Sequence, residues 1–193
     1  MLISLRGTNG SGKSTVIKAL FEACPPKRKI NGVLGIRLPE AYELSVPKCK
    51  KPVFVLGPYV TACGGCDRLI PFDIIPPLIE KYAKRGHVIF EGVIVASIYG
   101  QVGALMEKYK KQSVMLFLDT TLEECIERVQ SRRDKRDDDR EFNPDNLKQK
   151  FKATQRVKEK VTTDGIMRVE TAPSDTAHKK IIKLLQEDLR GLS

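Results

Sequence analysis

The first residues whose types and spacing could carry chemistry form a glycine-rich turn, Gly7-Thr-Asn-Gly-Ser-Gly-Lys-Ser14. Its glycines let the backbone curl so that successive N–H groups can surround an anion. Lys13 adds a positive charge, the Ser14 hydroxyl can ligate Mg²⁺, and Thr15 can donate to an inner phosphate. The turn matches G-x-x-x-x-G-K-[ST] at every fixed position and predicts binding of a nucleoside triphosphate. The expected binding residues are Gly7, Thr8, Asn9, Gly10, Ser11, Gly12, Lys13, Ser14 and Thr15.

The segments that flank this turn are those that a phosphate-binding loop needs. Residues 2–6 form an apolar run that predicts a buried strand, and residues 14–23 have the apolar spacing of a helix. The positive end of that helix dipole would face the bound phosphates. We therefore expect ATP with Mg²⁺ to bind here. A turn that matches by chance, or a loop that has lost its activity, are the alternatives.

The remaining elements alternate along the chain. This alternation implies a parallel sheet with helices on both faces, within a single domain covering residues 1–193. The expected strands are 2–6, 32–38, 87–91, 113–118 and 165–170, with a short strand at 52–56 inside an otherwise irregular segment, 40–70. The expected helices are 14–23, 73–85, 93–109, 121–133, 143–161 and 175–189.

The charge balance bears on the partner. The chain has 34 basic and 24 acidic residues, a net charge of +10, and such an excess attracts polyanions. Nucleic acid is therefore one expected partner, and an ordinary solvated surface is the alternative. The clusters that could contact a DNA backbone are 27–29, 48–51, 108–111 and 148–152.

Other features of the composition predict a reduced, cytoplasmic protein without a membrane span. No apolar run reaches the roughly 20 residues that a membrane helix needs, and the start of the chain lacks a signal-peptide pattern. The five cysteines are an odd number, which favours free thiols. Cys63 and Cys66 could be half of a zinc site, a redox pair or a tight turn facing the substrate; without a second such pair, the turn is favoured.

Several segments resemble the nucleoside and nucleotide kinases, and thymidylate kinases in particular. Glu91-Gly-Val-Ile-Val-Ala-Ser97 with Ile-Tyr-Gly-Gln101 is similar to their Asp-Arg-Tyr…Ser…Gln stretch, and Leu116-Phe-Leu-Asp119 is similar to their fourth strand. The resemblance implies a three-layer P-loop kinase fold, α/β, with five parallel strands in the order 2-3-1-4-5. It also implies an arginine-rich lid at about 132–142, substrate contact by Ser97, and an adenine-facing loop at Thr171–Ser174 that includes Pro173.

Two departures from thymidylate kinases point to a different acceptor. The Arg that helps those enzymes to hold the acceptor's phosphate is Gly92 here, and the segment Gly57-Pro-Tyr-Val-Thr-Ala-Cys-Gly-Gly-Cys-Asp67 is foreign to them. This segment, with Phe90-Glu-Gly-Val93, resembles phage kinases that phosphorylate the hydroxymethyl group of 5-hydroxymethyluracil within DNA, the first step of thymidine hypermodification. That resemblance implies a DNA substrate, substrate contact by Tyr59, and a location in the host cytoplasm. A free deoxynucleoside or deoxynucleoside monophosphate kinase and a DNA-binding ATPase are the alternatives.

The residues expected to act on the acceptor lie at strand ends and in turns. Glu91 ends a strand expected beside the first one, and is the candidate for a general base or a water-mediated Mg²⁺ ligand. A helix-capping carboxylate is the alternative for Glu91. Asp67 could orient the acceptor, Arg68 could hold a DNA phosphate, and Arg37 ends the expected second strand, where substrate contacts are common.

The segment 132–141 is almost wholly charged and is the candidate lid. Phosphoryl transfer depends on positioning and on neutralising charge, and a lid arginine can supply both when it closes. We expect one or two of Arg132, Arg133, Arg136 and Arg140 to act, with Arg132 and Arg136 assigned as catalytic. Pairing with the interleaved aspartates is the alternative. The sequence leaves the oligomeric state open, a homodimer included.

Overall fold

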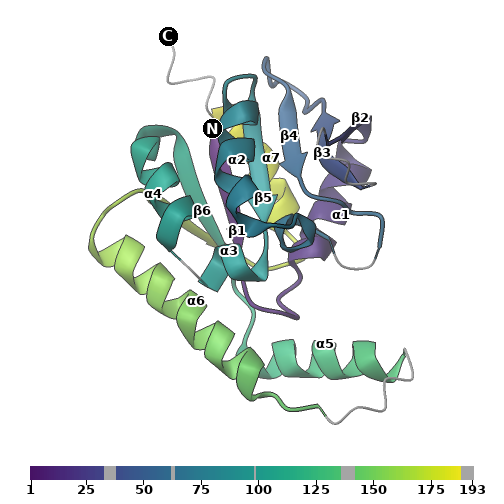
Figure 1. Cartoon of the computed structure of the whole chain (residues 1–193), viewed down its shortest axis with the longest axis vertical. Coiled ribbons are helices and arrows are strands. Elements are labelled where there is room, and N and C mark those ends of the chain that lie inside the picture. Colours follow the sequence, from purple (N-terminus) through teal and green to yellow (C-terminus); the bar gives the residue numbers. More distant parts are fainter. Residues whose placement is uncertain (33–37, 62–63, 98, 136–141, 188–193) are drawn as a thin grey trace.

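The computed structural model shows a seven-stranded mixed sheet with helices on both faces (Figure 1). It describes residues 1–32, 38–61, 64–97, 99–135 and 142–187, with Ser97 described by its backbone alone. The strand order is β2-β3-β4-β5-β1-β6-β7. The strands are β1 (Leu2–Arg6), β2 (Pro26–Asn31), β3 (Pro39–Leu44), β4 (Val53–Leu56), β5 (His87–Glu91), β6 (Ser113–Leu118) and β7 (Arg168–Ala172).

The strand β1 lies in the middle of the sheet and all of its residues are buried. It pairs in parallel with β5 on one side and with β6 on the other. The strands β4 and β7 extend this parallel part outward, whereas β3 runs antiparallel to both β4 and β2. The carboxyl ends of β1, β5 and β6 therefore meet at one edge of the sheet, where ligands commonly bind in such folds.

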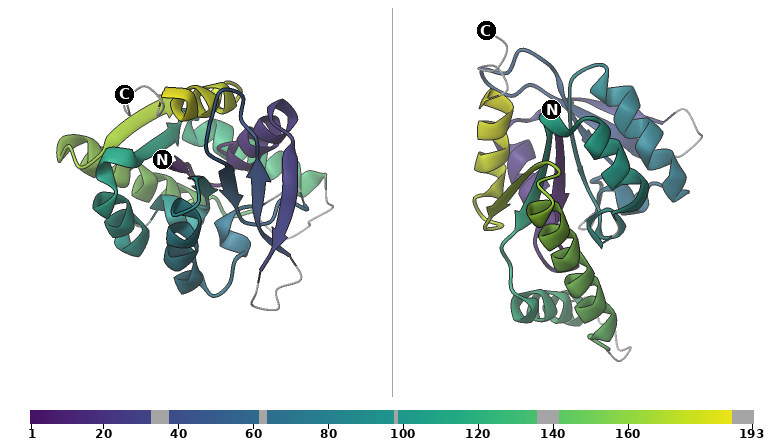
Figure 2. Two further views of the ribbon diagram at one scale, coloured as in Figure 1. Left: turned by 90° about the horizontal axis from the view of Figure 1, so that it is seen from above. Right: turned by 90° about the vertical axis from the view of Figure 1, so that its left-hand side faces the viewer.

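Helices cover both faces of the sheet, so the three expected layers are present (Figure 2). Helices α1 and α7 contribute Ile17 and Ile181 to one apolar cluster, and α2 and α4 contribute Ile79 and Met106 to another. The helices are α1 (Lys13–Ala23), α2 (Ile75–Ala83), α3 (Val93–Ser97), α4 (Gly100–Lys108), α5 (Leu122–Asp134), α6 (Asp145–Thr163) and α7 (Ala177–Glu187), with short 3-10 turns η1 (Cys66–Arg68), η2 (Phe72–Ile74) and η3 (Lys110–Gln112).

Helix α5 lies beyond the carboxyl edge of the sheet, roughly across its end (Figure 1). A capping box fixes its start, because Thr121 and Glu124 each bond the other's backbone N–H. Helix α6 begins beside α5 and returns along the sheet, where it packs against α3 and β7. No helix among the described residues is long and apolar enough to cross a membrane.

The prediction of five parallel strands was wrong, because the sheet has seven and is mixed. Gly32 and Leu38 do not lie in a strand, and residues 33–37 are outside the described part. The segment 26–31 pairs instead with 39–44, which had been expected to be irregular. Strand β2 is an edge strand with exposed lysines and an initial proline, so it lacks the apolar pattern that predicts strands.

The bounds of one helix and of the last strand also differ from expectation. The helix expected at 93–109 is divided into α3 and α4, and Gly100 begins the second of them. The last strand covers Arg168–Ala172 rather than 165–170. Gly165 has φ of 58°, a left-handed conformation that ends the preceding helical segment rather than starting a strand.

Candidate active site

The phosphate-binding loop joins the carboxyl end of β1 to α1, as its sequence predicts. Gly10 and Gly12 have φ of 81° and 97°, which side chains rarely allow. Space is equally limited: a Cβ on Gly10 would lie 2.4 Å from the carbonyl oxygen of Cys125, and one on Gly12 would lie 2.8 Å from Cβ of Ser174. The loop is therefore held between α5 and the β7–α7 loop, and only glycine fits at either position.

Lys13 lies against the loop it belongs to. Its Nζ donates to the carbonyl oxygens of Gly7 at 2.8 Å and Thr8 at 3.0 Å, and the residue is 6% exposed. Burial lowers the pKa of Lys13, while the nearby carboxylates of Glu91 and Asp67 act in the opposite direction. The ammonium is thus positioned at the loop, with acidic groups across from it.

Glu91 ends β5, directly beside Leu5 of β1, and is 1% exposed. Its Oε1 accepts hydrogen bonds from the hydroxyls of Ser14 at 3.3 Å and Tyr59 at 3.4 Å. Burial raises the pKa of Glu91 to about 7, with Lys13 opposing this shift and Asp67 adding to it. A carboxyl group with such a pKa can both take up and release a proton near neutral pH.

Asp67 belongs to η1, and its side chain lies at the start of α3. Its Oδ2 accepts from the N–H of Val93 at 2.5 Å and its Oδ1 from the N–H of Ile94 at 3.1 Å, so it caps this helix. A Cβ on Gly92 would lie 2.7 Å from Oδ1 of Asp67. Any side chain at position 92 would therefore collide with the cap.

These groups surround one pocket of about 550 Å³ at the carboxyl edge of the sheet. Its walls come from the phosphate loop, the turn before η1, the end of β5, helix α5 and the β7–α7 loop. The lining residues that the sequence had singled out are Thr8, Asn9, Gly10, Gly12, Lys13, Ser14, Thr15, Asp67, Arg68, Glu91 and Arg132. Ser174, which also lines the pocket, ends the loop expected to face the adenine, and the lining residues that had not been singled out as site residues are Gly64, Val93, Arg128 and Asp175.

Some expected residues lie behind the pocket wall. Gly7 and Ser11 form the back of the loop, where the hydroxyl of Thr120 donates to the carbonyl oxygen of Ser11 at 3.1 Å. Tyr59 reaches the site through its bond to Glu91. Burial and Glu91 raise the pKa of Tyr59 well above its ordinary value, so the phenol keeps its proton as a donor. Pro173 directly precedes the pocket residue Ser174.

Arg128 lies on the helix that resembles the entry to the kinase lid, but no site role of its own was predicted for it. Its Nη1 donates to the carbonyl oxygen of Gly10 at 3.4 Å, and its Nη2 lies 3.4 Å from Oε1 of Glu124. Arg128 and Arg132 are four residues apart on α5, so they lie on the same face of the helix. This spacing was the signal available in the sequence. Arg37, Arg136, Arg140, Cys63 and the side chain of Ser97 are outside the described part of the chain.

The zinc interpretation of Cys63 and Cys66 gains no support from the described residues. Cys66 is fully buried, and burial raises the pKa of its thiol well above the ordinary value. Across the described ranges, no group of three or more His, Cys, Asp or Glu side chains is arranged to hold a metal ion. Magnesium bound with a nucleotide needs fewer protein ligands, because phosphate and water oxygens supply most of its coordination.

Comparison with known proteins relates this sequence to one family of enzymes. The family described as 5-hmdU DNA kinase matches residues 77–176. The chain is 36% identical over 187 residues to a 5-hmdU DNA kinase of Pseudomonas phage PaMx11, covering 96% of this chain and 97% of that protein. It is 27% identical over 174 residues to a 5-hmdU DNA kinase of Pseudomonas phage M6, with 84% and 86% covered. A solved deoxyadenosine kinase from M. mycoides aligns over both whole chains at 13% identity and a TM-score of 0.46, which is too low to carry an argument.

The raised pKa of Glu91 predicts a cost in stability at alkaline pH. The folded pKa of about 7 exceeds the ordinary value of 4.5, so the folded state binds this proton more tightly than the unfolded state does. Stability from this group is therefore present below pH 4.5 and is lost as pH rises through 7. The glutamine of Glu91→Gln cannot ionise, so this variant does not pay the cost. The difference in free energy of unfolding, variant minus wild type, should therefore rise by on the order of 3 kcal/mol between about pH 5 and about pH 8.

Urea unfolding of the two proteins at both pH values measures this difference. The exposed Glu127→Gln is the matched control and should track wild type at both pH values. A Glu91→Gln variant with the same relative stability at both pH values would show that Glu91 ionises in the folded protein as it does in the unfolded chain.

Proposed function

Because the chain belongs to the 5-hmdU DNA kinase family, we propose that it transfers the γ-phosphoryl group of ATP to the hydroxymethyl oxygen of 5-hydroxymethyluracil in DNA. The observation that carries this proposal is the buried carboxyl of Glu91, bonded to Ser14 of the phosphate loop within one pocket. It brings a proton acceptor and a triphosphate-binding loop to the same place. A hydroxyl acceptor needs both.

The residues present fit a nucleoside triphosphate with Mg²⁺. Gly10 and Gly12 have the positive φ that lets the loop curl with its N–H groups toward phosphates, and Lys13 is near enough to move from the loop carbonyls to the outer phosphates. Ser14 would ligate Mg²⁺ directly and Glu91 through water. When bound, the ion neutralises the charge that builds up on the phosphoryl oxygens. Pro173 and Ser174 would lie toward the adenine.

Glu91 is proposed as the general base of the transfer. It accepts the proton of the hydroxymethyl O–H while that oxygen forms a bond to the γ-phosphorus. The bond from the γ-phosphorus to the β,γ-bridging oxygen breaks, and ADP leaves with the electron pair. The hydroxyls of Ser14 and Tyr59 hold Oε1 of Glu91 in place during this step.

The positive groups of the pocket would stabilise the transferred phosphoryl. Lys13 faces it from the loop, while Arg128 and Arg132 reach the same pocket from α5. Fixed positive groups aimed at developing charge supply much of the catalysis in phosphoryl transfer. Arg132 therefore keeps the catalytic role expected of it. Arg136 and the rest of the expected lid remain proposals for a segment outside the described residues.

The acceptor side of the pocket suits a neutral hydroxyl better than a phosphate. Thymidylate kinases, which this chain resembles, carry a phosphate-holding Arg where Gly92 stands. Here the space beside Gly92 belongs to Asp67, which caps α3 and adds negative charge to the pocket. Asp67 would orient the base, and Arg68 would contact a phosphate of the DNA backbone.

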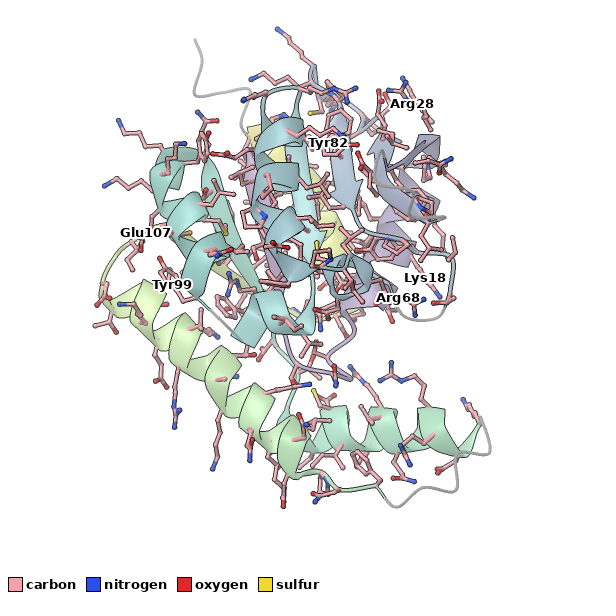
Figure 3. All side chains as sticks on the ribbon, in the orientation of Figure 1. Lys18, Arg28, Arg68, Tyr82, Tyr99 and Glu107 are labelled. Atoms are coloured by element: carbon pink, nitrogen blue, oxygen red, sulfur yellow. The ribbon has the colours of Figure 1, made fainter. Side chains whose placement is uncertain are left out.

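The topology also selects among the basic clusters. Residues 48–51 directly precede β4, and residues 108–111 directly precede β6, so both lie at the amino edge of the parallel strands, opposite the pocket. Arg28 pairs with Glu43 at the same end, whereas Arg68 lies toward α5 (Figure 3). The cluster 148–152 lies on the first half of α6, beside α5. We propose that the DNA backbone runs along this part of α6.

Lys13→Ala should reduce transfer of labelled phosphate from ATP by about a hundredfold or more, because it removes the main positive charge from the loop. Lys18→Ala is the matched control: this exposed lysine lies on the same helix, and its removal should leave the rate unchanged. Circular dichroism checks that both variants fold. Equal rates for Lys13→Ala and Lys18→Ala would contradict the role given to the loop.

Replacing both Lys152 and Arg156 by alanine should weaken DNA binding and make it less sensitive to salt. Both side chains are exposed, one helical turn apart on α6. Each lost phosphate contact should reduce the slope of log affinity against log salt by about 1, measured by fluorescence anisotropy between about 50 and 200 mM salt. The matched control replaces Lys110 and Lys111 by alanine and should keep the wild-type slope. If the control loses as much as the α6 variant, DNA does not follow this face.

An acceptor panel tests the function itself. The protein is incubated with γ-labelled ATP and, separately, DNA containing 5-hydroxymethyluracil, unmodified DNA, and free 5-hydroxymethyldeoxyuridine and its monophosphate. We expect stable label on the modified DNA alone. Label confined to the free compounds would reject the proposal in favour of a nucleoside or nucleotide kinase. Free phosphate released with unmodified DNA, and no label on any acceptor, would indicate a DNA-stimulated ATPase.

A further inference from the structure

The carboxyl of Glu91 lies too deep for a base that remains in the double helix. The residue is 1% exposed, and a Cβ on Gly65 would lie 2.5 Å from its Oε1, so the turn before η1 lies directly against it. The pocket in front of Glu91 has walls from five separate segments. Only a group that enters the pocket can come within hydrogen-bond distance of the carboxylate.

A paired 5-hydroxymethyluracil would offer its hydroxyl from within the major groove, where the 5-substituent of a pyrimidine projects. That groove is about 12 Å wide and admits a single helix or a two-stranded ribbon. The phosphate loop, α3 and α5 all line the pocket that contains Glu91, and they cannot all enter the groove. Glu91 therefore cannot reach the hydroxyl of a paired base, and the base has to leave the duplex and enter the pocket.

Resting on the function proposed above, we infer that this protein acts on a 5-hydroxymethyluracil swung out of the duplex into the pocket. We infer further that Ile94, with Ile70 and Val60, forms an apolar rim that packs against the bases left behind. The inference adds to the proposed function the state of the DNA and the residues that support that state.

The rim is defined by unusual exposure. Val60 is 52% exposed, Ile70 74% and Ile94 40%, and among the residues the structure describes these are the large apolar side chains that stand exposed. Each belongs to a segment of the site. Val60 follows Tyr59, Ile70 lies two residues after Arg68, and Ile94 follows Val93. Single exposed apolar residues are ordinary, but each of these three lies within two residues of one that lines the pocket or bonds Glu91.

Ile94 is the best fixed of the three. Its N–H bonds to Oδ1 of Asp67 at 3.1 Å, and Asp67 itself lines the pocket. Helix α3, on which Ile94 lies, packs against β1, α6 and η1, and these contacts hold Ile94 in place. Apolar side chains at such positions are used by proteins that unstack bases, where they pack into the disturbed step.

The charges around the pocket suit the backbone of a distorted duplex. Arg68, Arg128 and Arg132 line the same pocket, and α6 beyond α5 carries the exposed basic residues Lys152 and Arg156. An extruded nucleotide carries its own phosphates toward the enzyme, so cations are needed at the pocket as well as along the duplex.

Single-turnover transfer rates on three DNAs test the inference. The substrates carry one 5-hydroxymethyluracil opposite adenine, opposite a mismatched base, or in a single strand, each with saturating enzyme. Because a mismatched base is easier to extrude, the mismatched duplex should react at least about tenfold faster than the paired duplex. Equal rates on the paired and mismatched duplexes would overturn the extrusion. Failure to label any of the three DNAs, with label on free nucleotides, would instead overturn the proposed function.

Ile94→Ala tests the rim, with Ile94→Leu as the matched variant that keeps the apolar volume. The alanine variant should slow the paired duplex several-fold more than the mismatched duplex, and the leucine variant should restore the wild-type ratio of the two rates. An equal loss on both duplexes would show that Ile94 supports the fold of the site and does not take part in opening the base pair.

Discussion

The site depends on holding two ionisable side chains, Lys13 and Glu91, in one buried pocket. Glu91 is 1% exposed and Lys13 is 6% exposed, and burial opposes the charged form of each. Both line the same pocket because β5 pairs with β1 in a register that sets Glu91 beside Leu5, just before the phosphate loop. The glycines of the loop and the contacts of Thr120 and Arg128 then hold the loop in the conformation that keeps Lys13 there.

The parts of the fold that could be predicted from sequence are those specified by local pattern. The loop follows from its glycines, and β5 follows from an apolar run that ends at an acidic residue. The edge strand β2 could not be predicted in this way, because it has exposed lysines and is held by pairing with β3 rather than by burial. The apolar residues after β2 predicted a strand at 32–38, but Gly32 and Leu38, at the two ends of that segment, do not lie in a strand.

The same distinction applies to the site. Lys13, Ser14 and Glu91 were found because their residue types carry their chemistry. Ser174 was expected in the loop facing the adenine, but its contact with Gly12 across the fold could not be predicted from local pattern. Asp67 shows a third case: its expected role in orienting the acceptor overlaps with capping α3, a contact that depends on the β5–α3 junction.

The acceptor preference has a structural counterpart in these contacts. Thymidylate kinases, which this chain resembles, have a phosphate-holding Arg at the position of Gly92. Here no side chain could occupy that position beside Asp67. Lys13, Arg68, Arg128 and Arg132 line the pocket together with the carboxyl groups of Glu91, Asp67 and Asp175. Of these carboxyls Glu91 is the buried one, and its raised pKa suits a group that accepts a proton from a hydroxyl.

The most direct test of the account is the pH dependence of kcat/KM, measured with ATP and 5-hydroxymethyluracil DNA both well below saturation. This quantity reports the ionisations of the free enzyme. The pKa of Glu91, raised by burial to about 7, predicts that kcat/KM rises with pH through a single ionisation near that value and then levels. The rise should be absent from the residual rate of Glu91→Gln. A wild-type profile that is flat from about pH 5.5 to about pH 8.5 would contradict Glu91 as the base.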